Sequence, residues 1–247
     1  MTDSGLIFLV LATYLGAGLV KGLVGLGLPT VTLVALVPAI GLAPAVALTV
    51  VPTVVTNVAQ AFTGGRLHAI LRRLWPLLAA SVVGCFLGTG VLAGGATDVL
   101  TRLLGVLLAL YAAVALLAPP LPAPGRFEPW LAPVVGGVAG MMAGMVGSFT
   151  MPGVVFIQSL GLARDELVQA LGVVFLTLSV TLGVGLGHHA VFSGPLVGLS
   201  ALAVAPALLG MEAGRRVRTR LPEAGFRKVF LFALLALGLN LALGATS

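Results

Sequence analysis

Residues 129–163 read PWLAPVVGGVAGMMAGMVGSFTMPGVVFIQSLGLA, a run of 35 residues without Asp, Glu, Lys or Arg. A helix that crosses a bilayer needs roughly 20 apolar residues in a row. The run is therefore long enough for one span and part of another. Gly147 and Pro152 interrupt it, and it predicts a membrane helix, a break, and a second, shorter helix.

The rest of the chain has the same character. Hydrophobic residues make up 59% of the 247 residues, charged residues make up 8%, and the mean hydropathy is +1.18. An average soluble domain is about 25% charged, so this composition excludes a soluble enzyme and intrinsic disorder. Further runs without charged residues are 4–20, 22–65, 74–97, 103–125, 167–211 and 229–247.

Divided at glycine and proline clusters and at charges, the chain predicts about ten membrane-inserted elements. They should be helices, because a lone apolar segment satisfies its backbone in lipid only as a helix. The second and seventh are too short to cross about 30 Å at about 1.5 Å per residue. We therefore predict an all-α polytopic membrane protein with short or broken helices two and seven. The ten ranges are 5–20, 28–40, 44–63, 74–94, 98–118, 129–146, 152–161, 166–187, 194–213 and 226–244.

Basic loops predict the orientation, because cytoplasmic loops are rich in Lys and Arg. Two loops carry most of the basic residues, one between elements three and four and one between elements nine and ten. Both are predicted to be cytoplasmic, which places both termini outside. Short spans at elements two and seven, or re-entrant hairpins formed by elements one and two and by elements six and seven, give the same parity. The net charge of +6 is then explained by basic residues that set the orientation in the membrane, and no nucleic-acid partner is expected. The basic residues are Arg66, Arg72 and Arg73 in the first loop and Arg215, Arg216, Arg218, Arg220, Arg227 and Lys228 in the second.

The chain also repeats itself at a distance of about half its length. A Gly-x-x-x-Gly pair followed by a proline occurs near the start and again at mid-chain, and a second pair occurs late in each half. With five elements in each half, the second half must be inverted relative to the first. Inverted halves with matching breaks are typical of transporters, whereas glycine pairs alone are also typical of helix packing. The matching residues are Gly18, Gly22 and Pro29 with Gly140, Gly144 and Pro152, and Gly84 and Gly88 with Gly210 and Gly214.

The predicted organisation is an N-terminal repeat over 1–118, a linker over 119–128, and a C-terminal repeat over 129–247. The linker reads PPLPAPGRFE, and such proline-rich segments mark loops.

The two Gly/Pro breaks are predicted to form one anion site. A full charge at the bilayer centre costs at least about 2.5–3.5 kcal/mol, whereas helix N-termini attract anions through backbone N–H groups. The alternative is that the two breaks are simple interruptions of helices and that packing alone stabilises them. The backbone is expected to come from Gly25, Gly27 and Gly147, and hydroxyl donors from Thr30, Ser148 and Thr150.

Polar residues also form a stripe on the third element, on roughly one helical face. Asn57 and Gln60 are the costliest of these to bury, and we expect them to bind substrate; their alternative is to join helices, for about 0.6 kcal/mol each. Lys21 either attracts anions or extends to the surface and sets the topology. The stripe is Thr49, Thr53, Thr56, Asn57 and Gln60, and a sparser one on element eight is Gln169, Thr177 and Thr181.

Three segments together resemble the TauE/SafE sulfite-exporter family: KGLVGLGLPT at 21–30, GMMAGMVGSFTMPG at 140–153 and GMEAGRRVRTRL at 210–221. The resemblance implies two related halves and transport of small anions, chiefly sulfite or organosulfonates, across the bacterial inner membrane.

The function predicted is therefore secondary transport of a small anion by alternating access, with the anion and the lipid bilayer as partners. No cofactor and no metal are expected. An intramembrane serine protease is one alternative, although Gly147-Ser148-Phe149-Thr150 lacks the Gly-x-Ser-Gly pattern of that class. A non-transporting membrane scaffold is the other, and it gives no reason for duplicated breaks.

Overall fold

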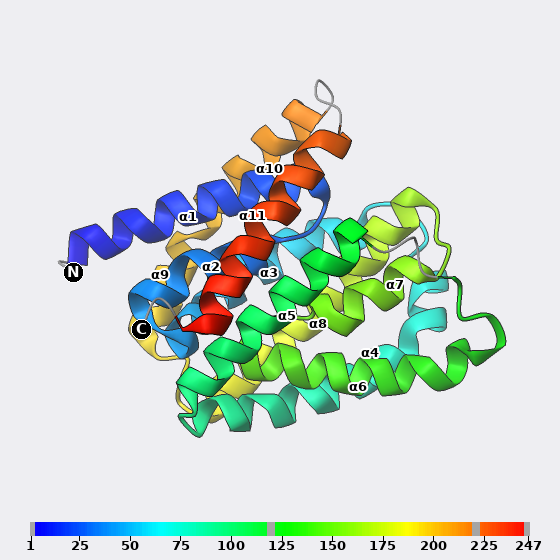
Figure 1. Cartoon of the computed structure of the whole chain (residues 1–247), viewed down its shortest axis with the longest axis horizontal. Coiled ribbons are helices and arrows are strands. Elements are labelled where there is room, and N and C mark those ends of the chain that lie inside the picture. The colour runs from blue at the N-terminus through cyan, green and yellow to red at the C-terminus, as the bar shows by residue number, and fades with distance from the viewer. Residues whose placement is uncertain (1–2, 118–121, 219–222, 245–247) are drawn as a thin grey trace.

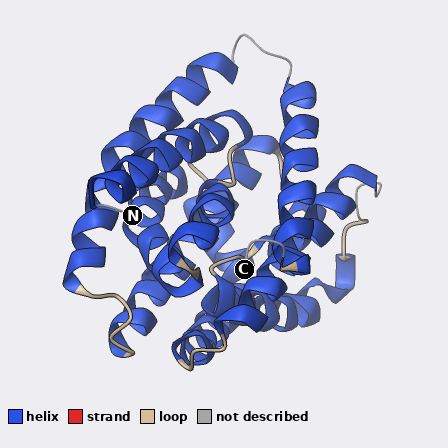
Figure 2. Cartoon of the chain, turned by 60° about the vertical axis from the view of Figure 1, so that its left-hand side comes forward, coloured by secondary structure: helices blue, strands red, loops and turns tan. Residues whose placement is uncertain are grey.

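The computed structural model describes residues 3–117, 122–218 and 223–244. These residues form helices joined by short loops, and none of them lies in a β-strand (Figure 2). The all-α fold is confirmed. In chain order the elements are α1 (Asp3–Val24), α2 (Leu28–Ile40), α3 (Leu42–Phe62), α4 (Leu67–Ala93), α5 (Thr97–Leu117), the 3-10 turn η1 (Gly125–Phe127), α6 (Glu128–Val146), the π-helical turn η2 (Thr150–Val154), α7 (Val155–Ser159), α8 (Arg164–His188), α9 (Gly194–Leu202), α10 (Val204–Arg218) and α11 (Glu223–Leu243).

The helices have the lengths that a multi-pass membrane protein requires. Seven stretches of the described chain are long and apolar enough to cross a bilayer. The 13-residue α2, by contrast, is about 20 Å long at 1.5 Å per residue and spans only part of the thickness. Helix α1 begins and α11 ends on the same side of the molecule (Figure 1). Parts of three predictions lie outside the described residues: linker residues 119–121, the basic Arg220, and the terminal residues 1–2 and 245–247.

Two predicted helices are divided, and proline explains both divisions. The seventh element is split into η2 and α7, with Met151 extended at φ −125° and ψ 127°, because a following proline disfavours the helical region. The ninth is split at Ala203 into α9 and α10. Pro206 lies three residues later, and its ring clashes with the carbonyl four residues before it, that of Leu202.

Helices α3 and α8 form the centre of the molecule and pack against each other. In the most apolar 18-residue stretch of each helix, the buried share is 61% for α3 and 56% for α8, compared with 22–39% for the other candidate spans. The peripheral helices expose large apolar side chains; Phe8 is 75% exposed and Trp130 77% exposed. A bilayer would cover this surface, which is far more apolar than a soluble monomer tolerates.

Pro52 shows how the centre is held together. A proline inside a helix leaves the carbonyl four residues earlier without its usual donor. Here that carbonyl is Leu48 O, and it accepts hydrogen bonds from Tyr14 Oη of α1 at 2.6 Å and from Ser200 Oγ of α9 at 2.8 Å. The break in the α3 ladder therefore ties α3 to two neighbours, as membrane helices require.

Glycine pairs bring two helix pairs into backbone contact (Figure 1). On α1, a Cβ at Gly18 or Gly22 would overlap a backbone carbonyl of α10. On α4, a Cβ at Gly84 or Gly88 would overlap a carbonyl of α6. The glycine pairs of the sequence are therefore packing residues, and each pair from one half faces a pair from the other: Gly18 and Gly22 with Gly210 and Gly214, and Gly84 and Gly88 with Gly140 and Gly144.

Candidate functional site

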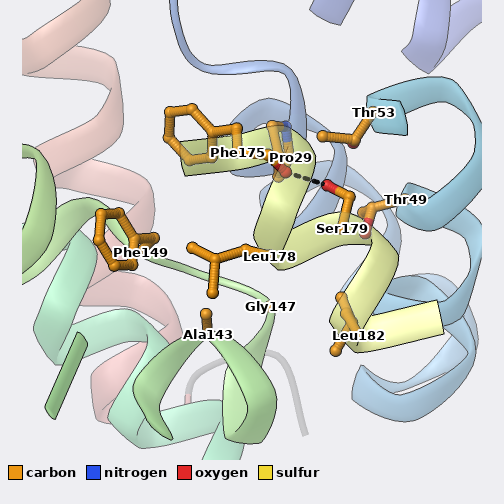
Figure 3. A pocket seen from close by; sticks show the side chains of 10 residues that line it. All are labelled: Pro29, Thr49, Thr53, Ala143, Gly147, Phe149, Phe175, Leu178, Ser179 and Leu182. Carbon is orange, nitrogen blue, oxygen red and sulfur yellow. Dashed lines mark hydrogen bonds between the residues drawn. The ribbon is translucent and has the colours of Figure 1, made fainter. Parts of the chain in front are cut away.

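A small cavity lies between the start of α2, the middle of α3, the end of α6 and the middle of α8 (Figure 3). Its volume is about 20 Å³, and a cavity needs roughly 10–15 Å³ to hold one water molecule. The site is therefore nearly closed in this conformation. Its lining residues are Pro29, Thr49, Thr53, Ala143, Gly147, Phe149, Phe175, Leu178, Ser179 and Leu182.

Both Gly/Pro breaks border this cavity. Pro29, in the first turn of α2, contributes from the first break, and Gly147 and Phe149 contribute from the second. Gly27 caps α2 with φ 107°, and Gly147 caps α6 with φ 72°. These left-handed conformations favour glycine over residues with a Cβ. The breaks therefore depend on their glycines, and the fold brings the two breaks together.

The remaining predicted residues of the two breaks lie beside the cavity without lining it. Thr30 follows Pro29 and is buried. Ser148 and Thr150 flank Phe149, are both buried, and are hydrogen-bonded to each other through their hydroxyls at 2.8 Å. Gly25 and Gly27 precede α2. Of the eight residues predicted for the site, Gly147 is the one that lines the cavity, and the other seven are Gly25, Gly27, Thr30, Asn57, Gln60, Ser148 and Thr150.

The α3 stripe supplies the polar wall. Thr49 and Thr53 line the cavity, and Figure 3 shows Thr53 extending towards Pro29. The Thr49 hydroxyl donates to Val46 O of its own helix at 2.7 Å. The Thr53 hydroxyl is buried and has no hydrogen-bond partner among the described residues. Both threonines belong to the stripe predicted from the sequence, but they are not among the eight predicted site residues.

One turn further along α3, Asn57 contacts a buried lysine. Asn57 is 1% exposed, and its Oδ1 accepts a hydrogen bond from Lys21 Nζ of α1 at 2.5 Å. Lys21 also donates to Thr56 Oγ1 at 3.0 Å and is 5% exposed. The interpretation that Lys21 extends to the membrane surface is therefore wrong: the side chain turns inward to the α3 stripe.

Gln60 joins the first break to α8. Its Nε2 donates to Gly25 O at 3.2 Å and to Val168 O at 2.8 Å. Gln169, the next residue on α8, donates back to Ala61 O at 2.9 Å. In this conformation the Gln60 amide hydrogens are used between helices, and substrate binding by Gln60 stays a prediction.

The α8 wall is the part of the site that the sequence did not reveal. It consists of Phe175, Leu178, Ser179 and Leu182, at the three- and four-residue steps of one helical face. Ser179 is the polar member, and it donates to Phe175 O of its own helix at 2.7 Å (Figure 3). The two α8 threonines predicted from the sequence also bond within their own helix, Thr177 to Val173 O and Thr181 to Thr177 O, but they do not line the cavity.

Comparison with known proteins gives the family. A profile described as sulfite exporter TauE/SafE matches residues 10–241, which include both breaks and every cavity-lining residue. Among curated proteins and solved structures, no match to the chain was found. The family is one of membrane transporters, which agrees with the apolar helices and the buried polar site. The chain belongs to the sulfite exporter TauE/SafE family.

Proposed function

We propose that this protein is a secondary transporter that moves a small anion, sulfite or an organosulfonate, by alternating access at the cavity between its two breaks. The observation that carries the proposal is the cavity itself, which both Gly/Pro breaks border. Thr53 lines it, and the buried Thr53 hydroxyl has no partner among the described residues. A family of sulfite exporters supplies the substrate class.

The pairing of helices supports two inverted repeats over 1–118 and 129–247. The first helix of each half packs on the fourth of the other, α1 on α10 and α6 on α4. The third helices, α3 and α8, pack on each other, and so do the fifth helices, α5 and α11. A two-fold axis in the membrane plane that exchanges the halves produces this pattern, and it also exchanges the two membrane faces, as alternating access requires.

The closed cavity fits a carrier better than a channel. A space for one water molecule cannot admit an anion with four heavy atoms, so loading requires helices around the site to separate. The hydrogen bonds of Gln60 and Gln169 between α3 and α8 lie at the end of α3 that precedes the basic residue Arg66. This end is the predicted cytoplasmic side, and these bonds would part when the site opens there.

The breaks would stabilise the anion through backbone N–H groups and the helix dipole. The first turn of a helix leaves backbone N–H groups without partners inside the helix, and its dipole favours an anion. The first turn of α2 reaches the cavity at Pro29, a residue suited to this position because it lacks an N–H. Backbone at Gly25, Gly27 and Gly147, the hydroxyls of Thr30, Ser148 and Thr150, and the amides of Asn57 and Gln60 complete the proposed site.

Location in the bacterial inner membrane, with both termini periplasmic, is part of the same proposal. The excess of basic residues near Arg66 and Arg73 supports a cytoplasmic position for that end of the bundle. Trp130 is 77% exposed at the start of α6, and exposed tryptophan is enriched where helices enter the headgroup region.

The test is solute flux in liposomes that contain the purified protein. Initial rates would be measured for sulfite, methanesulfonate, sulfate and acetate, with protein-free liposomes as the control and with imposed proton or sodium gradients. We expect flux of sulfite or methanesulfonate above the control. Absence of flux for all four, together with hydrolysis of a peptide or lipid, would support an enzyme instead. Absence of both activities would support a scaffold.

A further inference from the structure

Lys21 is a buried ionisable residue with no acidic partner in the described part of the chain. Its side chain is 5% exposed, and none of the ion pairs found among the described residues involves it. Its hydrogen bonds go to two neutral oxygens, Thr56 Oγ1 and Asn57 Oδ1. A buried charge without a counter-charge is destabilising, and an ionisable residue inside a membrane domain points to function.

Hydrogen-bond donors without a partner among the described residues lie beside Lys21. An ammonium group has three N–H donors, and two of those on Lys21 have partners. Asn57 Nδ2 and Thr53 Oγ1 are both buried and lack partners among the residues described. Thr53 and Asn57 lie four residues apart on α3, so their side chains project from one face about 6 Å apart along the axis. Three donors without an acceptor among the described residues therefore lie within about one turn of α3.

We propose that Lys21 is the fixed positive charge of the substrate site and that Lys21 Nζ, Asn57 Nδ2 and Thr53 Oγ1 bind the oxygens of one anion. This proposal rests on the transport function proposed above. A bound anion would supply both the missing counter-charge and the missing acceptors. Because Thr53 also lines the cavity, the proposed three-donor site adjoins the cavity on its α3 side.

The charge and the walls select the class of anion. One lysine balances one negative charge, so a monoanion leaves the loaded site neutral, whereas a dianion such as sulfate leaves a net charge in a poorly hydrated site. A sulfonate group presents three oxygens to three donors. The opposite walls are apolar, with Phe149, Phe175 and Leu182, and suit the carbon attached to a sulfonate. The preferred class is therefore a monoanionic sulfonate or hydrogensulfite.

Binding can be measured as ligand-induced thermal stabilisation of the purified full-length protein, which grows with ligand concentration relative to Kd. Methanesulfonate is the probe, because it stays a monoanion at neutral pH, and sulfate is the comparison. We expect methanesulfonate to stabilise the wild-type protein at concentrations where sulfate has little effect. Equal stabilisation by both would overturn the charge argument.

Two variants test the cation directly. Lys21→Gln keeps a hydrogen-bond donor but removes the charge, and we expect the Kd for methanesulfonate to rise roughly 10- to 100-fold, as for a lost charge-assisted hydrogen bond. Asn57→Asp is nearly isosteric and gives Lys21 a fixed counter-charge, so the variant should fold and yet lose methanesulfonate binding. Wild-type binding by either folded variant would overturn the proposal.

Thr53→Val covers the case in which neither variant folds, because the Thr53 hydroxyl has no hydrogen-bond partner among the described residues. We expect weaker methanesulfonate binding with an unchanged melting temperature of the free protein. The control is Thr89→Val, which removes a buried hydroxyl that bonds within its own helix. Equal binding by Thr53→Val and Thr89→Val would overturn the three-donor site. Wild-type protein that carries no anion at all would instead contradict the proposed function.

Discussion

Gln60 and Gln169 exchange hydrogen bonds across the two central helices. Gln60 of α3 donates to Val168 O of α8, and Gln169 of α8 donates to Ala61 O of α3. Each side chain bonds the backbone beside the other, and Gln169 Oε1 also accepts from Arg66 N at 3.1 Å. This reciprocal pair holds α3 against α8 at one end of the bundle, and a carrier has to break it to open that end.

The first prediction separates the helix-joining role of Gln60 from substrate binding. Gln60→Leu and Gln169→Leu should each lower the melting temperature, because each removes interhelical hydrogen bonds worth about 0.6 kcal/mol, up to about 1.7 kcal/mol. If Gln60 also binds substrate, Gln60→Leu alone should reduce stabilisation by methanesulfonate. Identical ligand stabilisation in the two variants would assign Gln60 to helix joining only.

The second prediction concerns the glycine contact between α1 and α10. Gly22→Ala should lower the yield of folded protein, because its Cβ would overlap Met211 O and backbone atoms of α10, and overpacking typically destabilises by about 1–3 kcal/mol. Gly16→Ala on the same helix is the control, since a Cβ there meets nothing within 4 Å. Equal melting temperatures for the two variants would contradict the close contact.

The third prediction places the second break at the site. Gly147 and Gly161 have similar positive φ values, 72° and 67°, so alanine at either costs about 1–2 kcal/mol of backbone strain. A Cβ at Gly147 would also press on Val46 at 3.0 Å and Leu33 at 3.2 Å, whereas one at Gly161 meets nothing within 4 Å.

We therefore expect Gly147→Ala to lose methanesulfonate stabilisation and Gly161→Ala to keep it. The readout is the thermal shift of each purified variant with and without ligand. Retention of the full shift by Gly147→Ala would place the anion away from this break.

The fourth prediction is the orientation in the membrane. Cys85 is the sole cysteine and is fully buried, so single cysteines can be added without background labelling. Ala96→Cys and Thr63→Cys lie at exposed positions on opposite predicted sides. A membrane-impermeant maleimide should label Ala96→Cys in intact cells and Thr63→Cys only after lysis. The reverse pattern, or labelling of both in intact cells, would contradict periplasmic termini.

The sequence predicts most span ends well, because glycine and charge mark them directly. The predicted start of the fourth element at residue 74 is wrong, because α4 begins at Leu67 and continues through the charged Arg72 and Arg73. The predicted second helix, 28–40, agrees with α2 at both ends, since Gly27 and Gly41 bracket it with positive φ values of 107° and 79°. The family also follows from the sequence, because its motifs surround the same breaks. The division of the ninth element at Ala203 was not predicted, although Pro206, which causes it, is visible in the sequence.

The site is harder to predict because a membrane helix is apolar on all sides. Phe175, Leu178 and Leu182 face the cavity, but their residue types do not differ from those that face lipid, so α8 carries no amphipathic signal. Lys21 shows the same difficulty. Whether it extends outward or turns inward depends on the rotation of α1, which the Gly18 and Gly22 contact with α10 fixes, and this contact joins segments about 190 residues apart.

Counterflow tests the transport mechanism most directly. Liposomes that contain the wild-type protein would be loaded with excess unlabelled methanesulfonate or, under anaerobic conditions, sulfite, and placed in a trace of the same radiolabelled anion. A carrier with alternating access brings labelled anion in from the outside, whereas on the inside the excess of unlabelled anion occupies the site and slows the exit of label. The label inside should therefore rise transiently above its equilibrium level and then fall. If the label approaches equilibrium without this overshoot, or if neither anion enters at all, alternating-access transport is contradicted.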